Sequence, residues 1–166
     1  SLPNLEWNTV PEEQVYVTKR IENCSFMQAL EGEIDSSHST FLHSALSNDA
    51  FTTPVAVNLV RSKGESYRMQ DKRPHFQVLD TDAGEMIGAS YKAEEDSRYW
   101  RITQFLAPFH TIIPPYGDNP SFSGHAWVPM DDHHTLALCF TYHPTEALSE
   151  PMLRTLKHGQ RVVSHS

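Results

Sequence analysis

The chain has 166 residues, of which 39% are hydrophobic and 20% are charged, so we expect one folded domain, residues 1–166, rather than a disordered segment. Its formal net charge of −8 disfavours a nucleic-acid backbone or an anionic membrane as a partner. The two cysteines, Cys24 and Cys139, form no CxxC pair, which excludes an iron–sulfur cluster held by this chain and is typical of a cytoplasmic protein.

The first part of the chain predicts an extended lead-in, a strand and a helix. Residues 1–14 contain two prolines and lack the basic and apolar regions of a secretory signal. Residues 14–22 alternate in the manner of a strand. Residues 25–46 carry apolar side chains at helical spacing, although Gly32 and the run "SSHST" predict that the helix is distorted or restarts there.

The rest of the chain predicts antiparallel strands followed by a closing helix. Gly84 in "TDAGE" and the run "DDHH" are typical of hairpin turns. A final helix is expected over residues 145–159, with Thr145 as its cap. This order predicts an α+β fold with helices on one face of an antiparallel sheet. The expected strands are 51–60, 66–70, 75–80, 86–93, 97–113, 125–130 and 135–143.

Four potential metal-binding side chains, Glu31, Asp35, His38 and His43, lie close together in "QALEGEIDSSHSTFLHS". On a regular helix the first three share one face, whereas His43 lies about 140° further round than His38. Both imidazoles can therefore reach one ion only if the helix bulges or ends between them. By spacing alone, the cluster is either a metal site or the solvated face of a polar helix.

The whole string favours a metal site. "QALEGEIDSSHSTFLH" resembles the mononuclear iron motif QxLEGxxDxSHxxxLH of Rieske non-heme iron oxygenases, in particular the phthalate dioxygenase-like branch. "LPNLEWNTVPEEQVYVTKRI", "YWRITQFLAPFHTIIPPYG" and "GHAWVPMDDHHT" resemble other segments of that catalytic domain, in the same order. The resemblance therefore covers most of the chain.

This resemblance implies a fold and a metal site. The fold would be the helix-grip (START/Bet v 1-like) class, a curved antiparallel sheet packed on a long helix, incomplete here at the C-terminus. His38 and His43 would bind Fe(II), and Asp35 would relay electrons to the iron. The third ligand, a carboxylate, is expected outside this chain, because no segment matches the family's last ligand helix. Ser25 departs from the family, which usually has Asn at that position.

The resemblance also implies a larger parent enzyme. Its Rieske domain with a 2Fe–2S cluster has no counterpart in this chain, so the chain is expected to be an inactive fragment of a homotrimeric oxygenase. A reductase or ferredoxin would supply electrons, and dioxygen would be used to hydroxylate or dealkylate an aromatic substrate.

One basic side chain is a candidate for substrate binding. Arg101 is expected on the same strand face as Tyr99, Thr103 and Phe105. It could hold a substrate carboxylate, or it could be a surface arginine on the opposite face. A different class of function also fits the sequence, namely a helix-grip module that binds a hydrophobic ligand without catalysis and keeps a vestigial metal helix.

Overall fold

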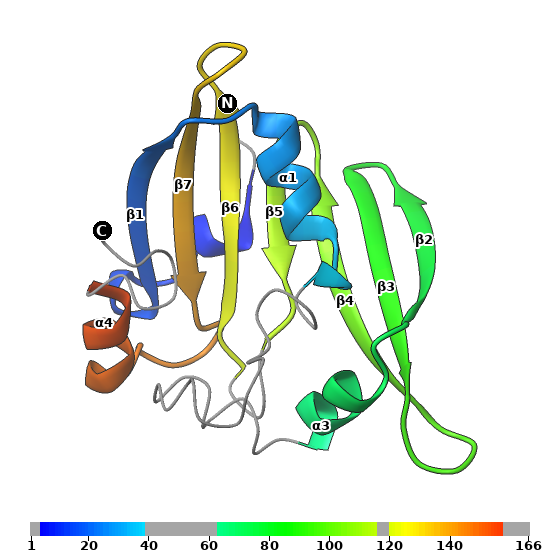
Figure 1. Ribbon diagram of the computed structural model, residues 1–166. Helices are drawn as coiled ribbons and strands as arrows, with labels where there is room; N and C mark the ends of the chain where they lie inside the picture. Colours follow the sequence, from blue (N-terminus) through cyan, green and yellow to red (C-terminus); the bar gives the residue numbers. More distant parts are fainter. Residues whose placement is uncertain (1–3, 39–62, 116–119, 158–166) are drawn as a thin grey trace, which may run out of the picture.

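A seven-stranded antiparallel sheet forms the body of the protein (Figure 1). The computed structural model describes residues 4–38, 63–115 and 120–157. The strand order is β1-β7-β6-β5-β4-β3-β2, so the first strand pairs with the last one. The strands are β1 Val15–Glu22, β2 His75–Thr81, β3 Gly84–Lys92, β4 Arg98–Leu106, β5 His110–Ile113, β6 Phe122–Pro129 and β7 Thr135–Tyr142.

Helix α1 lies across one face of this sheet, over β4, β5 and β6 (Figure 1). This arrangement confirms the predicted α+β class and the antiparallel sheet with a helix packed on it. The described helices are short, α1 Phe26–Ile34, α3 Lys63–Gln70 and α4 Glu150–Lys157, with two 3₁₀ turns, Glu6–Asn8 and Glu12–Gln14, where an extended lead-in was expected.

Apolar side chains are buried on both faces of the sheet, because strand alternation sends successive residues to opposite sides. On the face opposite α1, Trp7 stacks on Phe140 with ring centroids 4.1 Å apart. On the α1 face, a second cluster joins the helix to the central strands. Its buried members are Leu30, Trp127, Ala137 and Cys139, and Phe26, Ala29, Ile34, Phe105 and Phe109 pack against them.

The two predicted hairpins are confirmed. β2 and β3 meet at Gly84, whose φ of +144° is a conformation that favours glycine. β6 and β7 pair across the turn at residues 131–134. The predicted strand 97–113 is divided into β4 and β5 by a turn that contains the cis peptide Ala107–Pro108.

Two expectations about local structure were wrong. Residues 66–70 belong to helix α3, because a five-residue window is too short to separate a strand from a helix. The closing helix begins at Glu150 rather than near Thr145, and Ser149 precedes it and accepts hydrogen bonds from its first turn. Helix α1 ends at Ile34, just before the run "SSHST" at which a distortion or restart of the helix was expected.

The end of α1 has a local cause. Asp35 is extended, with φ −78° and ψ 100°, and its carboxylate accepts the backbone N–H groups of Ser37 at 2.7 Å and His38 at 3.2 Å. An aspartate that bonds the backbone ahead of it stabilises a turn in competition with the helix. The remainder of the predicted helix, 39–46, and the predicted strand 51–60 lie outside the described residues.

Candidate functional site

The turn that follows α1 holds two of the predicted site residues, Asp35 and His38. Because the helix ends at Ile34, the prediction that Glu31, Asp35 and His38 share one helix face was wrong. His38 Nδ1 donates to the backbone carbonyl of Asp35 at 2.5 Å and lies 3.8 Å from the Asp35 carboxylate. The hydrogen bond from His38 therefore goes to the carbonyl oxygen of Asp35 rather than to its carboxylate.

This geometry fits a metal-binding histidine. A ligating imidazole normally donates its second N–H to a nearby oxygen, which fixes the tautomer and the ring orientation. With Nδ1 bonded to Asp35, Nε2 of His38 is the nitrogen that would bind a metal, and imidazole is a suitable ligand for iron.

The other predicted iron ligand, His43, lies outside the described residues. Residues 4–38, 63–115 and 120–157 contain no group of three or more His, Cys, Asp or Glu side chains that could hold a metal ion. Asp131, which the sequence places in a hairpin turn, bonds to the backbone N–H groups of His133 and His134 there. Within the described residues, His38 is therefore the one predicted ligand that is placed.

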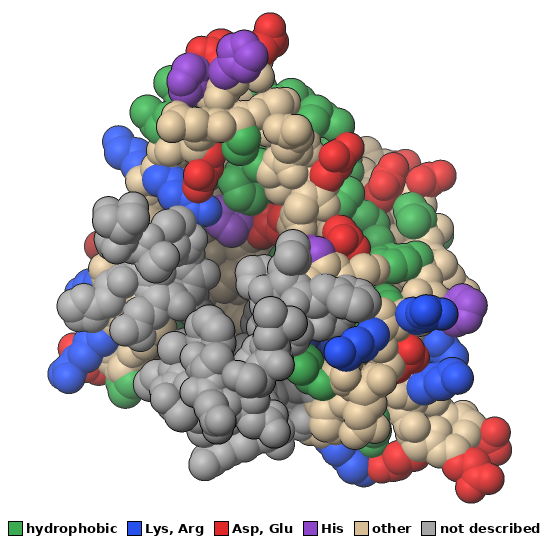
Figure 2. All heavy atoms as spheres, in the orientation of Figure 1, with side chains coloured by type: hydrophobic (Ala, Val, Ile, Leu, Met, Phe, Trp, Pro, Cys, Tyr) green, Lys and Arg blue, Asp and Glu red, His purple; other side chains and the backbone are tan. Residues whose placement is uncertain are grey.

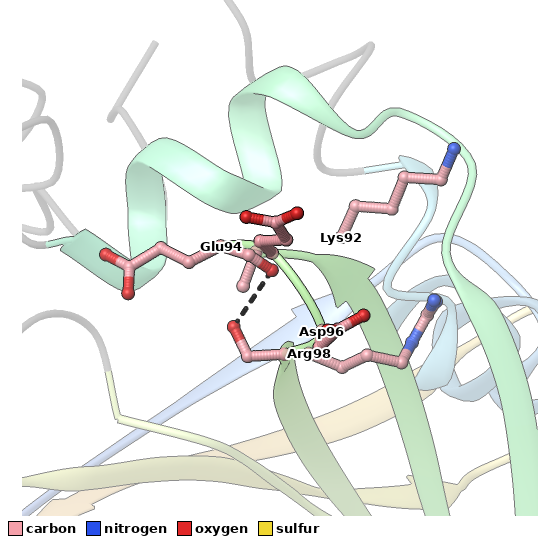
Figure 3. Close-up of a pocket in the computed structure, with 7 residues that line it drawn as sticks. Lys92, Glu94, Asp96 and Arg98 are labelled. Atoms are coloured by element: carbon pink, nitrogen blue, oxygen red, sulfur yellow. Dashed lines mark hydrogen bonds between the residues drawn. The ribbon is translucent and has the colours of Figure 1, made fainter.

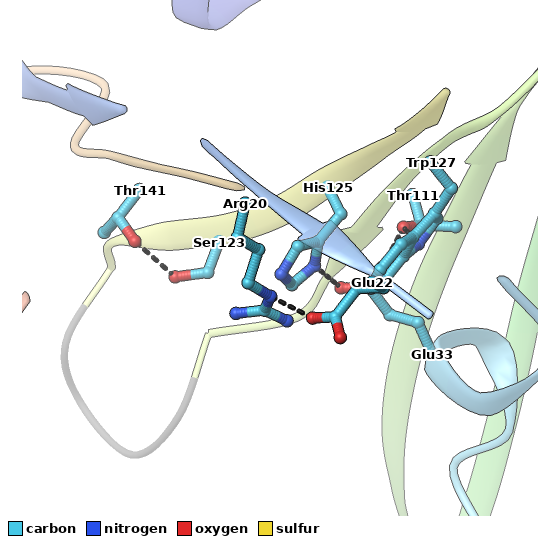
Figure 4. A network of polar contacts seen from close by, with 8 residues as sticks. All are labelled: Arg20, Glu22, Glu33, Thr111, Ser123, His125, Trp127 and Thr141. Atoms are coloured by element: carbon cyan, nitrogen blue, oxygen red, sulfur yellow. Dashed lines mark hydrogen bonds and ion pairs between the residues drawn. The ribbon is translucent and has the colours of Figure 1, made fainter. Parts of the chain in front are cut away.

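A second polar cluster, which sequence reasoning missed, lies under α1 (Figure 4). Glu33 points from the helix toward the sheet, and its side chain is only 9% exposed. Its carboxylate accepts hydrogen bonds from His125 Nδ1 at 2.6 Å, from Trp127 Nε1 at 2.7 Å and from the hydroxyl of Thr111. Three donors thus converge on one buried carboxylate, and we call these four residues the Glu33 network.

His125 is the titratable partner in the Glu33 network. Its ring stacks on Trp127, with centroids 4.5 Å apart and 19° between the planes. Burial lowers its pKa, but polar contact with the Cys139 thiol and the hydrogen bond to Glu33 outweigh burial and raise the pKa to about 9. The raised pKa favours the protonated ring. Its other nitrogen, Nε2, is buried and has no hydrogen-bond partner among the described residues.

The sequence contained part of the signal for this network. Glu33 follows the buried Leu30 by three positions, so a regular helix places both on the face that meets the sheet. His125 and Trp127 alternate along one strand and therefore share a face. The register that sets Thr111 opposite His125 depends on sheet pairing and is not encoded in either segment alone.

Arg101 lies in β4, on the strand face that also carries Tyr99, Thr103 and Phe105, as expected. Phe105 packs in the cluster under α1, so this is the α1 face of the sheet. The Arg101 side chain is buried, at 5% exposure, and its guanidinium donates to the carbonyls of Pro114 at 3.2 Å and Pro115 at 3.3 Å. Its role toward a substrate stays a prediction.

The surface offers a further hollow at the β3–β4 turn, lined by residues 92–98 and about 470 Å³ in volume (Figure 3). Lys92, Glu94, Asp96 and Arg98 surround it, and Ser97 donates to the Glu94 carbonyl at 3.1 Å. In the space-filling view, acidic and basic side chains are interspersed on the visible face (Figure 2). Across the described residues, no helix is long and apolar enough to cross a membrane.

The chain is similar to known oxygenase subunits. The family model described as "LigXa C-terminal domain like" matches residues 2–161. The 3-chlorobenzoate-3,4-dioxygenase oxygenase subunit of Comamonas testosteroni is 34% identical over 88% of this chain and 32% of its own length. The phthalate 4,5-dioxygenase oxygenase subunit of Pseudomonas putida is 35% identical over 78% of this chain and 29% of its own length. The chain thus spans about a third of these relatives.

Solved structures show the same fold. Dicamba monooxygenase matches with a TM-score of 0.60 over 97% of this chain and 48% of its own, at 11% identity. The terminal oxygenase of carbazole 1,9a-dioxygenase from Nocardioides aromaticivorans matches with a TM-score of 0.53 over 96% of this chain and 46% of its own, at 12% identity.

Proposed function

The chain belongs to the family of LigXa C-terminal-like domains, and we propose that residues 1–166 are part of the catalytic domain of an aromatic-ring oxygenase. The observation that carries this proposal is the 34% identity to a chlorobenzoate dioxygenase subunit across 88% of the chain. The orientation of the His38 ring also supports the proposal. The motif around His38 predicts an iron ligand, and a hydrogen bond from Nδ1 to the Asp35 carbonyl holds the ring as a ligating histidine requires. Because the chain spans about a third of its relatives, the activity belongs to a longer polypeptide.

In this proposal His38 and His43 hold Fe(II), and a carboxylate from outside the chain completes the site. When bound, iron would supply the activation of dioxygen for attack on the aromatic ring. The chain's own residues prepare that site. Asp35 holds the turn through its carboxylate and fixes the His38 ring through its carbonyl. We also assign Asp35 the electron-relay role that the family resemblance implies.

The proposed substrate is an aromatic carboxylate that is hydroxylated or dealkylated. Both curated relatives are named for aromatic carboxylates, 3-chlorobenzoate and phthalate. A carboxylate is best recognised by a fixed cationic donor, and the α1 face carries two such side chains, Arg101 and His125. The proposed partners are a reductase or ferredoxin that supplies electrons through a 2Fe–2S cluster, and two further copies of the parent subunit.

Turnover by the natural polypeptide that contains this chain tests the proposal. Supplied with an electron-donating reductase, it is expected to consume dioxygen with benzoate or phthalate and to form a hydroxylated product. His38→Ala and His43→Ala are each expected to lower the rate at least a hundredfold, whereas His134→Ala, in an exposed turn, should leave it unchanged.

Two results would decide against the oxygenase. Undiminished turnover in His38→Ala and His43→Ala would remove these residues from the iron site. Tight binding of an aromatic carboxylate by the wild type without any dioxygen consumption would favour the non-catalytic ligand-binding module.

A further inference from the structure

We propose that the edge strand β2 is an interaction surface, and that it pairs antiparallel with β2 of a second copy of this chain, with Gln77 of one copy opposite Gln77 of the other. The pairing relates the two copies by a two-fold axis and joins their sheets into one. The inference goes beyond the proposed function and is independent of it, because α1, which leads into the turn of His38, lies over β4, β5 and β6.

Strand β2 is the last strand of the sheet, and its outer edge is unpaired among the described residues (Figure 1). β3 is its neighbour on the inner side, and all residues from His75 to Thr81 are exposed to solvent. The strand at the other end of the sheet, β1, is half-buried at most of its positions instead. An unpaired edge presents a row of backbone N–H and C=O groups that a further strand can bind. β2 is therefore accessible for pairing.

The middle of β2 is apolar and carries no charge. Phe76, Val78 and Leu79 are 44%, 59% and 63% exposed. Natural proteins usually protect an edge strand with charged side chains, and β1 has Lys19 and Arg20 in its middle. Residues 76–79 have no such protection. A bare backbone edge combined with exposed apolar side chains is typical of a surface that binds another chain.

The charges at the two ends of β2 indicate what binds there. Arg73 comes just before the strand, whereas Asp80 and Asp82 lie at its far end, and all three residues are exposed. When two copies pair antiparallel, the basic end of each strand lies beside the acidic end of the other, and the two-fold axis makes this contact twice. A parallel arrangement would bring like charges together. β2 is therefore complementary to itself in the antiparallel direction.

The side chains of β2 also select a register. With Gln77 opposite its own copy, Phe76 lies opposite Val78 on both sides of the axis, and pairs of an aromatic with a β-branched side chain stabilise antiparallel strands. A register shifted by two residues places Phe76 opposite Asp80 instead. The chosen register also keeps Pro74, which lacks a backbone N–H, just outside the paired residues 75–79.

Disulfide trapping in the 166-residue chain tests the register. Gln77→Cys is expected to form a covalent dimer on mild oxidation, because opposite residues of antiparallel strands have Cα atoms about 4.5–5.5 Å apart, within disulfide range. Leu79→Cys is the matched control on the same strand. Leu79 lies opposite His75, so its own copy is about 13 Å further along the strand, which is beyond that range. Non-reducing electrophoresis compares both variants with the wild type.

Sedimentation equilibrium measures the strength of the pairing. Val78→Lys places a charge in the middle of the edge and is expected to weaken dimerisation at least tenfold. Val17→Lys is the matched control, because Val17 is exposed to a similar extent, 55%, on the opposite edge strand β1. It should leave dimerisation within twofold of the wild type.

Charge reversal tests the complementarity of the two ends. In this register Arg73 lies opposite Thr81, between Asp80 and Asp82. Arg73→Glu, and Asp80→Lys together with Asp82→Lys, are each expected to weaken dimerisation at least tenfold, because like charges then meet on both sides of the axis. All three changes combined should restore dimerisation to within threefold of the wild type, a rescue that loss of folding could not produce.

A wild type that stays monomeric across the concentration series would overturn the inference and leave this edge to a different partner, such as another segment of the longer polypeptide. Two further results would also overturn it: cross-linking of Leu79→Cys as complete as that of Gln77→Cys, or undiminished dimerisation of folded Val78→Lys. None of these assays involves iron or turnover, so their failure is distinguishable from failure of the proposed function.

Discussion

At the scale of single residues, the structure depends on one buried carboxylate. Glu33 satisfies three donors that come from β5 and β6, so one side chain of α1 ties the helix to the centre of the sheet. Removing a carboxylate from such a network leaves the donors buried without partners, which is costlier than losing a surface ion pair.

The raised pKa of His125 predicts how stability changes with pH. A group whose pKa rises on folding, here from 6.5 to about 9, stabilises the fold fully below pH 6.5 and loses that contribution as the pH rises through 9. We expect the free energy of unfolding to fall by up to about 3 kcal/mol between pH 6.5 and pH 10.

Urea denaturation at a series of pH values measures this change. His125→Gln should remove most of it, whereas His134→Gln should keep it. A decline of the same size in His125→Gln as in the wild type would show that other groups cause it.

At the scale of elements, the turn after α1 precedes the segment that carries the proposed metal ligands. The Asp35 carboxylate caps two backbone N–H groups, so Asp35→Ala is expected to lower the free energy of unfolding by about 1 kcal/mol. Asp35→Asn keeps an acceptor oxygen and should cost less than half as much. Thermal unfolding measures both variants, and an Asp35→Ala variant as stable as the wild type would mean that the carboxylate does not hold the turn.

Substitution by alanine is expected to have opposite effects on stability at two glycines, Gly84 and Gly32. At Gly84, with φ +144°, an added Cβ would lie 2.1 Å from the Phe105 carbonyl, so Gly84→Ala should destabilise the protein by about 2 kcal/mol or more. At Gly32, in α1, nothing lies within 4 Å of an added Cβ, so Gly32→Ala should stabilise it by about 0.5–1 kcal/mol. Urea denaturation of both variants checks this pair, and a neutral or stabilising Gly84→Ala would contradict it.

Elements with strong local signals could be predicted from the sequence. The hairpin at Gly84 is indicated by its turn residue, and the strand Val15–Glu22 by the alternation of its side chains. Both signals lie within a few positions of the chain. An interruption of the first helix was also predicted from the run "SSHST", but its end at Ile34 was not, because a side-chain hydrogen bond of Asp35 ends the helix there. Residues 66–70 have β-compatible side chains but form a helix, since five positions do not define a period.

At the scale of the whole molecule, the sequence predicted an antiparallel sheet with a helix on it, but not the register that assembles the site. His125 and Glu33 are 92 positions apart, and their contact requires that β6 lie beneath α1. His38 was proposed as a ligand from a local motif, whereas His125 had no assigned partner until the sheet order was known. The family model that matches residues 2–161 places the chain among LigXa C-terminal-like domains, and the solved structures share its fold.

The central proposal is that His38 and His43 contribute two ligands to an iron site, and an anaerobic Fe(II) titration measures their contribution directly. The wild type and His134→Ala are expected to bind a single Fe(II) with equal affinity, while His38→Ala and His43→Ala each weaken binding at least tenfold. Equal binding by all four proteins would contradict the assignment of these histidines as iron ligands.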